Sequence, residues 1–261
     1  MITLPVATFL AAAVLATSFL SGIFGMAGGM ILMGILLALL PVPAAMVLHG
    51  VTQMAANGWR AWLWRRHIAW RIVANYAAGA LAVALAMAAV RFAPSKPVAL
   101  IILGLTPFVT LLMPNRFTPD VRGFGAGFAC GAFCTGLQFV AGVSGPVLDA
   151  LVVRTELGRK SQVATKAAVQ VFGHALKVVY FAQLLAAGEQ VAPALLIGAI
   201  VLAVIGTQLS RRVLDAISDA QFRVWSRRLI AAIATFYLIQ GFTLQFAEPI
   251  AALAAIVAAR S

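Results

Sequence analysis

One stretch of sequence decides the fold of this chain, and it occurs twice. The first copy begins Gly25-Met-Ala-Gly-Gly29 and continues, after an apolar run, with His49, Gln53, Asn57 and Arg60. The second copy begins Gly142-Val-Ser-Gly-Pro146 and continues, after an apolar run, with Lys166, Gln170, His174 and Lys177. Residues 25–63 and 142–180 align without a gap, at a constant offset of 117. We therefore expect two related halves.

The polar residues of each copy follow one another in steps of four, four and three. This spacing places each set along one face of an α-helix. Both faces lie inside otherwise apolar segments. A duplicated polar stripe behind a duplicated glycine break is typical of the substrate site of a membrane transporter.

The composition is that of a membrane protein. Hydrophobic residues make up 63% of the 261 residues and charged residues 10%, and the mean hydropathy is +1.01. A soluble domain of this size could not bury so much apolar surface. We expect a single domain in the lipid bilayer over residues 1–261, with repeat one at 1–115 and repeat two at 116–261. The N-terminus lacks a basic segment and a cleavage site, which indicates a first span rather than a signal peptide.

The net charge of +12 would indicate nucleic-acid binding in a soluble protein. Here most cations lie in short loops between apolar segments, where they set the membrane topology, so no nucleic-acid partner is expected. Cys130 and Cys134 lie four residues apart in one apolar segment. We expect neither a disulfide nor a metal site from them, and no cofactor.

Ten apolar segments predict helices within the membrane. They are 4–21, 23–40, 43–64, 68–92, 98–114, 123–137, 139–153, 161–187, 191–210 and 229–247. An apolar tail at 249–259 is expected to form a short helix that either crosses the membrane or lies on it. Glycines separate the first two segments of each half. We expect each such pair to form a broken helix or hairpin that returns to the side from which it entered.

The distribution of positive charge predicts the topology. If the loop 65–71 is cytoplasmic, counting crossings places 115–122, 154–160 and 211–228 on the same side. These loops hold 13 of the 19 basic residues, and the opposite side holds three. The first hairpin then opens to the outside and the second to the cytoplasm, with the two polar helices antiparallel.

The predicted fold class is therefore an all-α polytopic membrane protein with two inverted-topology repeats. Each repeat is a broken-helix hairpin plus three transmembrane helices. Repeats of this kind place a shared site near the bilayer midplane.

Ionisable groups inside a membrane are costly, by about 3 kcal/mol for a central Lys or Arg, so those present are candidates for function. A side-chain amide can both donate to and accept from a ligand. The predicted substrate-binding residues of the two stripes are Lys166, Gln170, His174, His49, Gln53 and Asn57. The amides could instead hold helices together, and Arg60 and Lys177 could extend to the membrane interface.

The glycine breaks supply further candidates. A helix N-terminus that points inward offers amide donors and partial positive charge, which favour an anion. The residues predicted to contribute are Gly25, Gly28, Gly29, Gly142, Ser144 and Gly145. Asp149 is an acid inside an apolar run and either pairs with Lys166 or carries a proton. Asp149, His49 and His174 are the candidate groups for proton coupling.

At these residues the chain resembles the sulfite exporter TauE/SafE family of bacterial membrane permeases. The resemblance rests on Gly22–Gly29, on Gly142-Val-Ser-Gly-Pro-Val-Leu148 and on Val163-Ala-Thr-Lys-Ala-Ala-Val-Gln170. It implies export of sulfite, an organosulfonate or another small sulfur-containing anion across the bacterial cytoplasmic (inner) membrane. The chain departs from the family pattern at Gln138–Ala141, where a glycine-rich lead-in is expected.

The sequence favours a secondary transporter over two other classes. A membrane-embedded enzyme acting on a lipid phosphate would need a carboxylate base near a nucleophile or a cationic clamp, and Asp149 is the only clear intramembrane acid. A structural subunit would leave the matched stripes unexplained. No phosphate-binding loop of an ATPase occurs. The anion, the coupling ion and the oligomeric state stay open.

Overall fold

The computed structural model describes residues 3–112, 120–152, 157–185, 191–216 and 219–258, and all of their regular structure is helical. A short 3₁₀ turn at Arg65–His67 follows the third α-helix. The α-helices are α1 (Leu4–Phe24), α2 (Met26–Leu39), α3 (Val42–Leu63), α4 (Trp70–Val90), α5 (Lys96–Leu112), α6 (Phe124–Ala141), α7 (Gly145–Val152), α8 (Arg159–Ala182), α9 (Pro193–Ala216) and α10 (Asp219–Ala258).

In each half of the chain, one glycine ends the first helix. Gly25 separates α1 from α2 with φ 66° and ψ −112°, and Gly142 ends α6 with φ 79° and ψ −13°. Glycine adopts these conformations readily, whereas the Cβ of other residues opposes them. Among the described glycines these two have positive φ, and they are separated by the repeat offset of 117.

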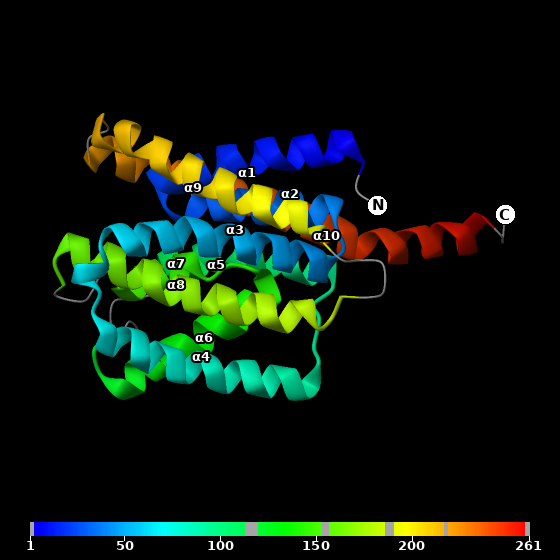
Figure 1. Cartoon of the computed structure of the whole chain (residues 1–261). Coiled ribbons are helices and arrows are strands. Elements are labelled where there is room, and N and C mark those ends of the chain that lie inside the picture. The colour runs from blue at the N-terminus through cyan, green and yellow to red at the C-terminus, as the bar shows by residue number, and fades with distance from the viewer. Residues whose placement is uncertain (1–2, 113–119, 153–156, 186–190, 217–218, 259–261) are drawn as a thin grey trace.

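The helix ends divide between the two ends of the molecule (Figure 1). Helices α3, α5, α7 and α9 end, and α4, α6, α8 and α10 begin, at the left-hand end in that view. The described parts of the predicted cation-rich segments lie at this end, where Lys160 lies over the Trp64 ring. The α1–α2 pair opens at the opposite end from the α6–α7 pair, as the charge distribution predicts.

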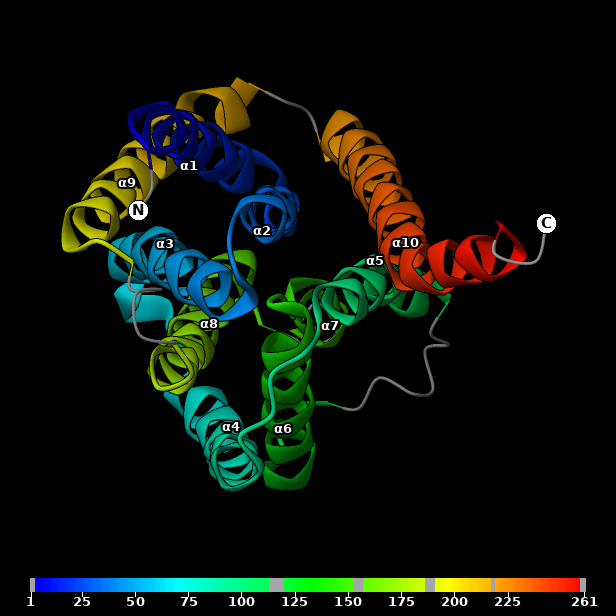
Figure 2. The same cartoon turned by 90° about the vertical axis from the view of Figure 1, so that its right-hand side faces the viewer.

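The helices pack in pairs, and each main pair joins a helix from the first half of the chain to one from the second half (Figure 2). Helix α1 packs on α9, and its counterpart α6 packs on α4. Helices α3 and α8 pack on each other, as do α5 and α10. Glycines permit the close crossings: Gly79 and Gly131 face the backbone across the α4–α6 contact. This pairing is the one expected for two halves related by a two-fold axis. The inverted repeat, with its boundary at 115/116, stays a prediction.

Five described helices are long and apolar enough to cross a membrane, namely α1, α4, α6, and the apolar parts of α9 and α10. Large apolar side chains on these helices are exposed, as expected of a lipid-facing surface: Leu85, Phe133, Ile197 and Ile239 are each more than 60% exposed. The polar stripes make α3 and α8 less apolar than these five helices, and much of each stripe is buried against neighbouring helices.

Three predicted boundaries were wrong. The second break lies at 142–144 rather than near 138, because Gly136 stays helical and the left-handed residue is Gly142. Helix α10 begins at Asp219, ten residues before the predicted span at 229, since its basic first turns are helical without being apolar. The predicted separate helix at 249–259 continues α10 to Ala258, consistent with its alanine-rich sequence.

Candidate functional site

The two polar stripes face each other along one seam. Helices α3 and α8 are antiparallel, because Gly58 lies beside Val171 whereas Gly50 lies beside Val178. Polar residues near the cationic end of α3 therefore meet those near the start of α8. The polar residues of the two helices fall into two separate groups. One group lies nearer the cationic end and includes Gln53 and Gln170, and the other lies nearer the opposite end.

The group nearer the cationic end lines a small polar cleft. The cleft lies where the Gly25 break meets α3, α7 and α8. Its lining residues are Ser21, Gly25, Met26, Gln53, Asn57, Arg60, Asp149, Lys166 and Gln170. In this structure the cleft has room for about one water molecule, so a small anion would need the lining side chains to move apart.

Lys166 and Asp149 form an ion pair across the cleft between α8 and α7. Both side chains are partly exposed, at 20% and 26%. Of the two roles predicted for Asp149, the structure thus places it in a pair with Lys166. An ion pair at such a site is weakly held compared with a buried one, so a ligand anion can compete with the carboxylate for the ammonium.

Arg60 adds a second cation, which feels the charge of Asp149 but forms no direct ion pair with a described carboxylate. Its guanidinium donates to Asn57 Oδ1 at 3.3 Å and to the Ser21 carbonyl at 3.3 Å. The Asn57 amide donates in turn to the Gln53 carbonyl at 2.9 Å, which fixes its orientation. Arg60 therefore lines the cleft instead of extending to the membrane interface. The two cations and one acid leave the cleft with a net positive charge.

The amides of Gln53 and Gln170 are available for a ligand, because neither makes a hydrogen bond to another described side chain or backbone group. Each lies against a glycine of a broken helix. A Cβ at Gly29 would be 3.3 Å from Gln53 Oε1, and a Cβ at Gly145 would be 3.6 Å from Gln170 Nε2. The first residue of α2, Met26, also lines the cleft, and no side chain caps this helix N-terminus. Its free amide groups favour an anion.

His49 and His174 were predicted to share this site, but they lie in a second cluster beyond the two glutamines. Lys177 Nζ donates to His49 Nδ1 at 2.8 Å and to the Gly142 carbonyl at 2.9 Å. His49 Nε2 lies 2.9 Å from the Gly29 carbonyl, and the two imidazole rings meet edge to face at 5.6 Å. Lys177 is fully buried, so it does not extend to the interface.

The other predicted residues have packing or backbone roles in the structure. Gly28 lies against the α1 backbone at Thr17, where a side chain would not fit. The carbonyls of Gly29 and Gly142 accept hydrogen bonds from the second cluster. Ser144 is buried just after the break, and its hydroxyl lies near the Tyr76 hydroxyl and the Cys134 thiol.

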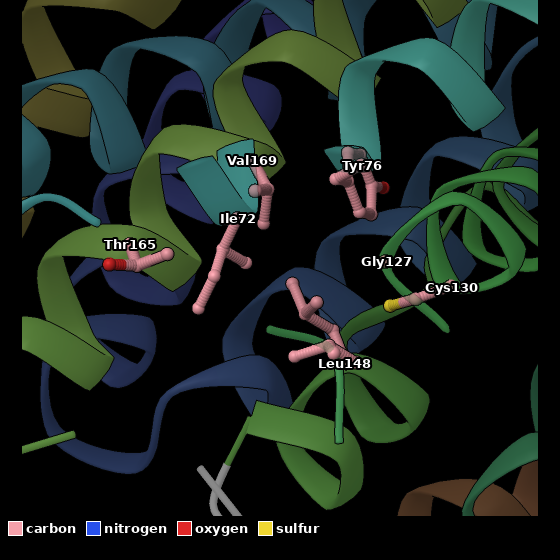
Figure 3. A pocket seen from close by; sticks show the side chains of 8 residues that line it. Ile72, Tyr76, Gly127, Cys130, Leu148, Thr165 and Val169 are labelled. Carbon is pink, nitrogen blue, oxygen red and sulfur yellow. The ribbon is translucent and has the colours of Figure 1, made fainter. Parts of the chain in front are cut away.

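Another small cavity lies between α4, α6, α7 and α8 (Figure 3). Apolar side chains such as Ile72, Leu148 and Val169 converge on it. The Thr165 hydroxyl accepts a hydrogen bond from the Ala69 amide at 2.9 Å and points away from the cavity. This apolar cavity does not suit an anion. Within the described ranges, no group of three His, Cys, Asp or Glu residues could hold a metal ion.

Sequence reasoning missed Ser21, Met26 and Gln138 as site residues. The repeat offset could have found two of them, because Ser21 and Gln138 are separated by the same 117 positions as the polar stripes. Both side chains are buried on the broken helices. Met26 contributes through its place at the start of α2, which the sequence alone did not indicate.

The fold and the cleft define a multi-pass helical membrane protein with a cationic polar cleft beside a broken helix. A family model described as Sulfite exporter TauE/SafE matches residues 9–238, so the chain belongs to this family. The family is one of membrane transporters of sulfite and related sulfur anions. No curated protein and no solved structure matches the chain.

Proposed function

We propose that this protein is a secondary transporter, and specifically an exporter, of a small sulfur-containing anion such as sulfite or an organosulfonate. The anion would bind in the cleft next to Lys166. The observation that carries the proposal is the combination of two cations with two unengaged amides and an uncapped helix N-terminus in one cleft.

Each of these groups suits an oxyanion. The Lys166 ammonium and the Arg60 guanidinium form charge-assisted hydrogen bonds with oxyanions, which are about twice as strong as neutral ones. The Gln53 and Gln170 amides add neutral donors to oxygen atoms. In this proposal the anion takes the place of Asp149 at Lys166. Its interaction with the ammonium offsets part of the free energy that the anion loses with its hydration shell.

The environment of the protein follows from the same proposal. The cation-rich end faces the cytoplasm of a bacterial cell, according to the positive-inside rule, and the protein lies in the cytoplasmic membrane. The cleft lies toward this end and would therefore load the anion from the cytoplasm. Protons are the proposed coupling ion, with His49, His174 and Asp149 as the candidate carriers.

An enzyme acting on a lipid phosphate is the alternative function. Such an enzyme needs a base that is free to accept a proton. In the cleft the only acid, Asp149, is bound to Lys166. No observation in the structure favours this alternative over transport.

Transport of labelled anions by the purified protein in liposomes tests the proposal. The panel is labelled sulfite, thiosulfate, sulfoacetate and sulfate, and the variants are Lys166→Met and Lys160→Met. Lys160 lies on the same helix and is exposed, so it controls for the loss of one positive charge. We expect wild type and Lys160→Met to move at least one sulfur anion, and Lys166→Met to lose most of the flux at low substrate concentration from the cleft side. Wild-type flux no greater than that of empty liposomes would contradict the proposal.

A further inference from the structure

The second polar cluster, formed by Lys177, His49, His174 and Gln138, has no role in the cleft. Each of these side chains is at most 3% exposed. The hydrogen bonds of Lys177 go to a neutral imidazole nitrogen and a carbonyl, and no described carboxylate pairs with it. Burying a lysine without a countercharge is costly. An anion would supply the missing countercharge.

The cluster corresponds to the cleft through the repeat. Subtracting the offset of 117 takes Lys177, His174, Gln138 and Gly142 to Arg60, Asn57, Ser21 and Gly25, in that order. All four of those residues line the cleft. The helix packing agrees with this relation. Helix α6 of the second half packs on α4 of the first, just as α1 of the first half packs on α9 of the second. The second half therefore carries its own version of the cleft, and in this structure that version is buried.

Several buried polar atoms around the cluster have no hydrogen-bond partner among the described residues. They include Gln138 Oε1 and His174 Nδ1, whereas the hydroxyls of Thr135 and Ser144 lie close enough to interact with that of Tyr76. Proteins rarely leave such atoms unpaired unless a water or a ligand completes them. The three hydroxyls can donate to an oxyanion, as can the Gln138 amide and Lys177.

Gly173 packs closely against two residues of this region. A Cβ at Gly173 would lie 2.5 Å from Gln138 Oε1 and 3.2 Å from the Tyr76 hydroxyl. The corresponding residue of the first half is Ala56. A methyl group at position 173 would therefore press directly on Gln138 and Tyr76 without removing any charge.

We propose that this cluster is a second binding site for the same small oxyanion, occupied when the anion is reached from the side of the membrane opposite the cleft. The inference rests on the proposed function. Lys177 would release His49 and the Gly142 carbonyl and bind the anion, as Lys166 releases Asp149 in the cleft. Lys166 and Lys177 are 11 residues apart on α8, which is about 16 Å along the helix at 1.5 Å per residue.

The test compares the two sides of the membrane. Inverted vesicles expose the cationic end and the cleft, whereas right-side-out vesicles expose the other end. The half-saturating concentration for labelled sulfite is measured from each side for wild type, Lys166→Met and Lys177→Met. We expect Lys177→Met to raise it at least tenfold from the side opposite the cleft and to leave it within twofold from the cleft side. Lys166→Met should show the reverse.

A second pair of variants keeps the test independent of the lysine. Gly173→Ala should reproduce the one-sided effect of Lys177→Met. Gly136→Ala, where a Cβ would meet its nearest neighbour at 3.9 Å, should match wild type. Lys177→Arg retains the charge and should recover part of the loss.

Two results would overturn the inference in different ways. If Lys177→Met and Gly173→Ala change the half-saturating concentration equally from both sides, or not at all, the second site is contradicted but the proposed function is not. Wild-type vesicles that move no sulfur anion in either orientation would overturn the proposed function and this inference together.

Discussion

Gly25 and Gly142 stand at the same position in the two halves of the chain, and each adopts a positive φ where the first helix of its half ends. The polar cleft begins at one of these breaks, and the buried lysine cluster begins at the other. The two breaks therefore position the polar groups of the protein.

We predict that alanine at either glycine destabilises the protein. At Gly25 no atom lies within 4 Å of a Cβ, so the cost is backbone strain alone, of order 1–3 kcal/mol. At Gly142 the Cβ would also meet Met33 Sδ at 2.5 Å, which adds to the strain. Thermal unfolding in detergent should show lower midpoints for both variants than for wild type.

Gly136→Ala is the matched control for these two variants. It lies within α6, where alanine is favoured over glycine by up to about 1 kcal/mol, so its midpoint should equal or exceed that of wild type. A Gly25→Ala protein as stable as Gly136→Ala would contradict the role assigned to the first break.

The sequence predicted most of the fold because its physical signals were local. Apolar runs and glycine breaks located the helices to within a few residues, and the arginine-rich loops indicated which ends lie together. The errors arose where a helix is not apolar or a glycine is not a break. The first turns of α10 leave the apolar pattern, and Gly136 stays helical because its φ is negative.

The site was predicted less well, because the repeat shows which residues correspond but not which ones meet. On two antiparallel helices, matched residues are close only near the crossing point. Gln53 and Gln170 both line the cleft. Arg60 and Lys177 belong to different polar groups. One predicted site therefore became a cleft and a buried cluster.

We predict that Asp149→Asn strengthens binding of a dianion to the cleft. Among the described residues, Asp149 is the only acid that lines the cleft, and its carboxylate competes with a ligand for Lys166. Removing one charge at this partly exposed position should gain roughly 1–2 kcal/mol, or about 5- to 30-fold in affinity. Calorimetric titration with sulfite measures the change. Asp120→Asn, at an exposed ion pair with Arg122, should leave affinity unchanged. An unchanged or weaker affinity in Asp149→Asn would show that the ligand does not compete with this carboxylate.

We predict that Gln53→Ala and Gln170→Ala each weaken anion binding by about 1–2 kcal/mol, the loss of one hydrogen bond to a charged group. Their amides have no other partner among the described residues. Gln208→Ala is the control, because its amide accepts a hydrogen bond from the Trp59 indole outside the cleft. If both cleft variants lose stability but keep the wild-type affinity, the glutamines serve only to hold α3 and α8 together.

We predict that the two halves superpose after a two-fold rotation about an axis in the membrane plane. The offset of 117, the matched glycine breaks and the exchanged helix pairs all favour this relation. An experimental structure should superpose residues 25–63 on residues 142–180 with the hairpins opening on opposite sides. Hairpins that open on the same side would exclude an inverted repeat.

The last prediction concerns the driving force of transport. His49 lies within hydrogen-bond distance of the Gly29 carbonyl through Nε2 and of Lys177 through Nδ1. Since a carbonyl can only accept, Nε2 carries the proton, and Nδ1 accepts from Lys177. A second proton on His49 would therefore face the lysine. His174 differs, because its Nε2 lies 3.5 Å from the side-chain nitrogen of Gln138, which can only donate, so Nε2 accepts and the proton is on Nδ1. A second proton on Nε2 would displace only this long hydrogen bond.

We therefore expect His174 to be the proton carrier among the three candidates. Its neighbours in the cluster are Lys177, His49 and Gln138, and an anion beside them would favour the protonated imidazole. Anion and proton would then bind together, so that flux in proteoliposomes follows an imposed pH gradient at fixed substrate speciation. His174→Gln should abolish this dependence, whereas His49→Gln should weaken transport but keep the dependence. If the dependence of flux on the pH gradient survives in His174→Gln and disappears in Asp149→Asn, the proton site lies in the cleft. If wild-type flux does not respond to the gradient, proton coupling is excluded.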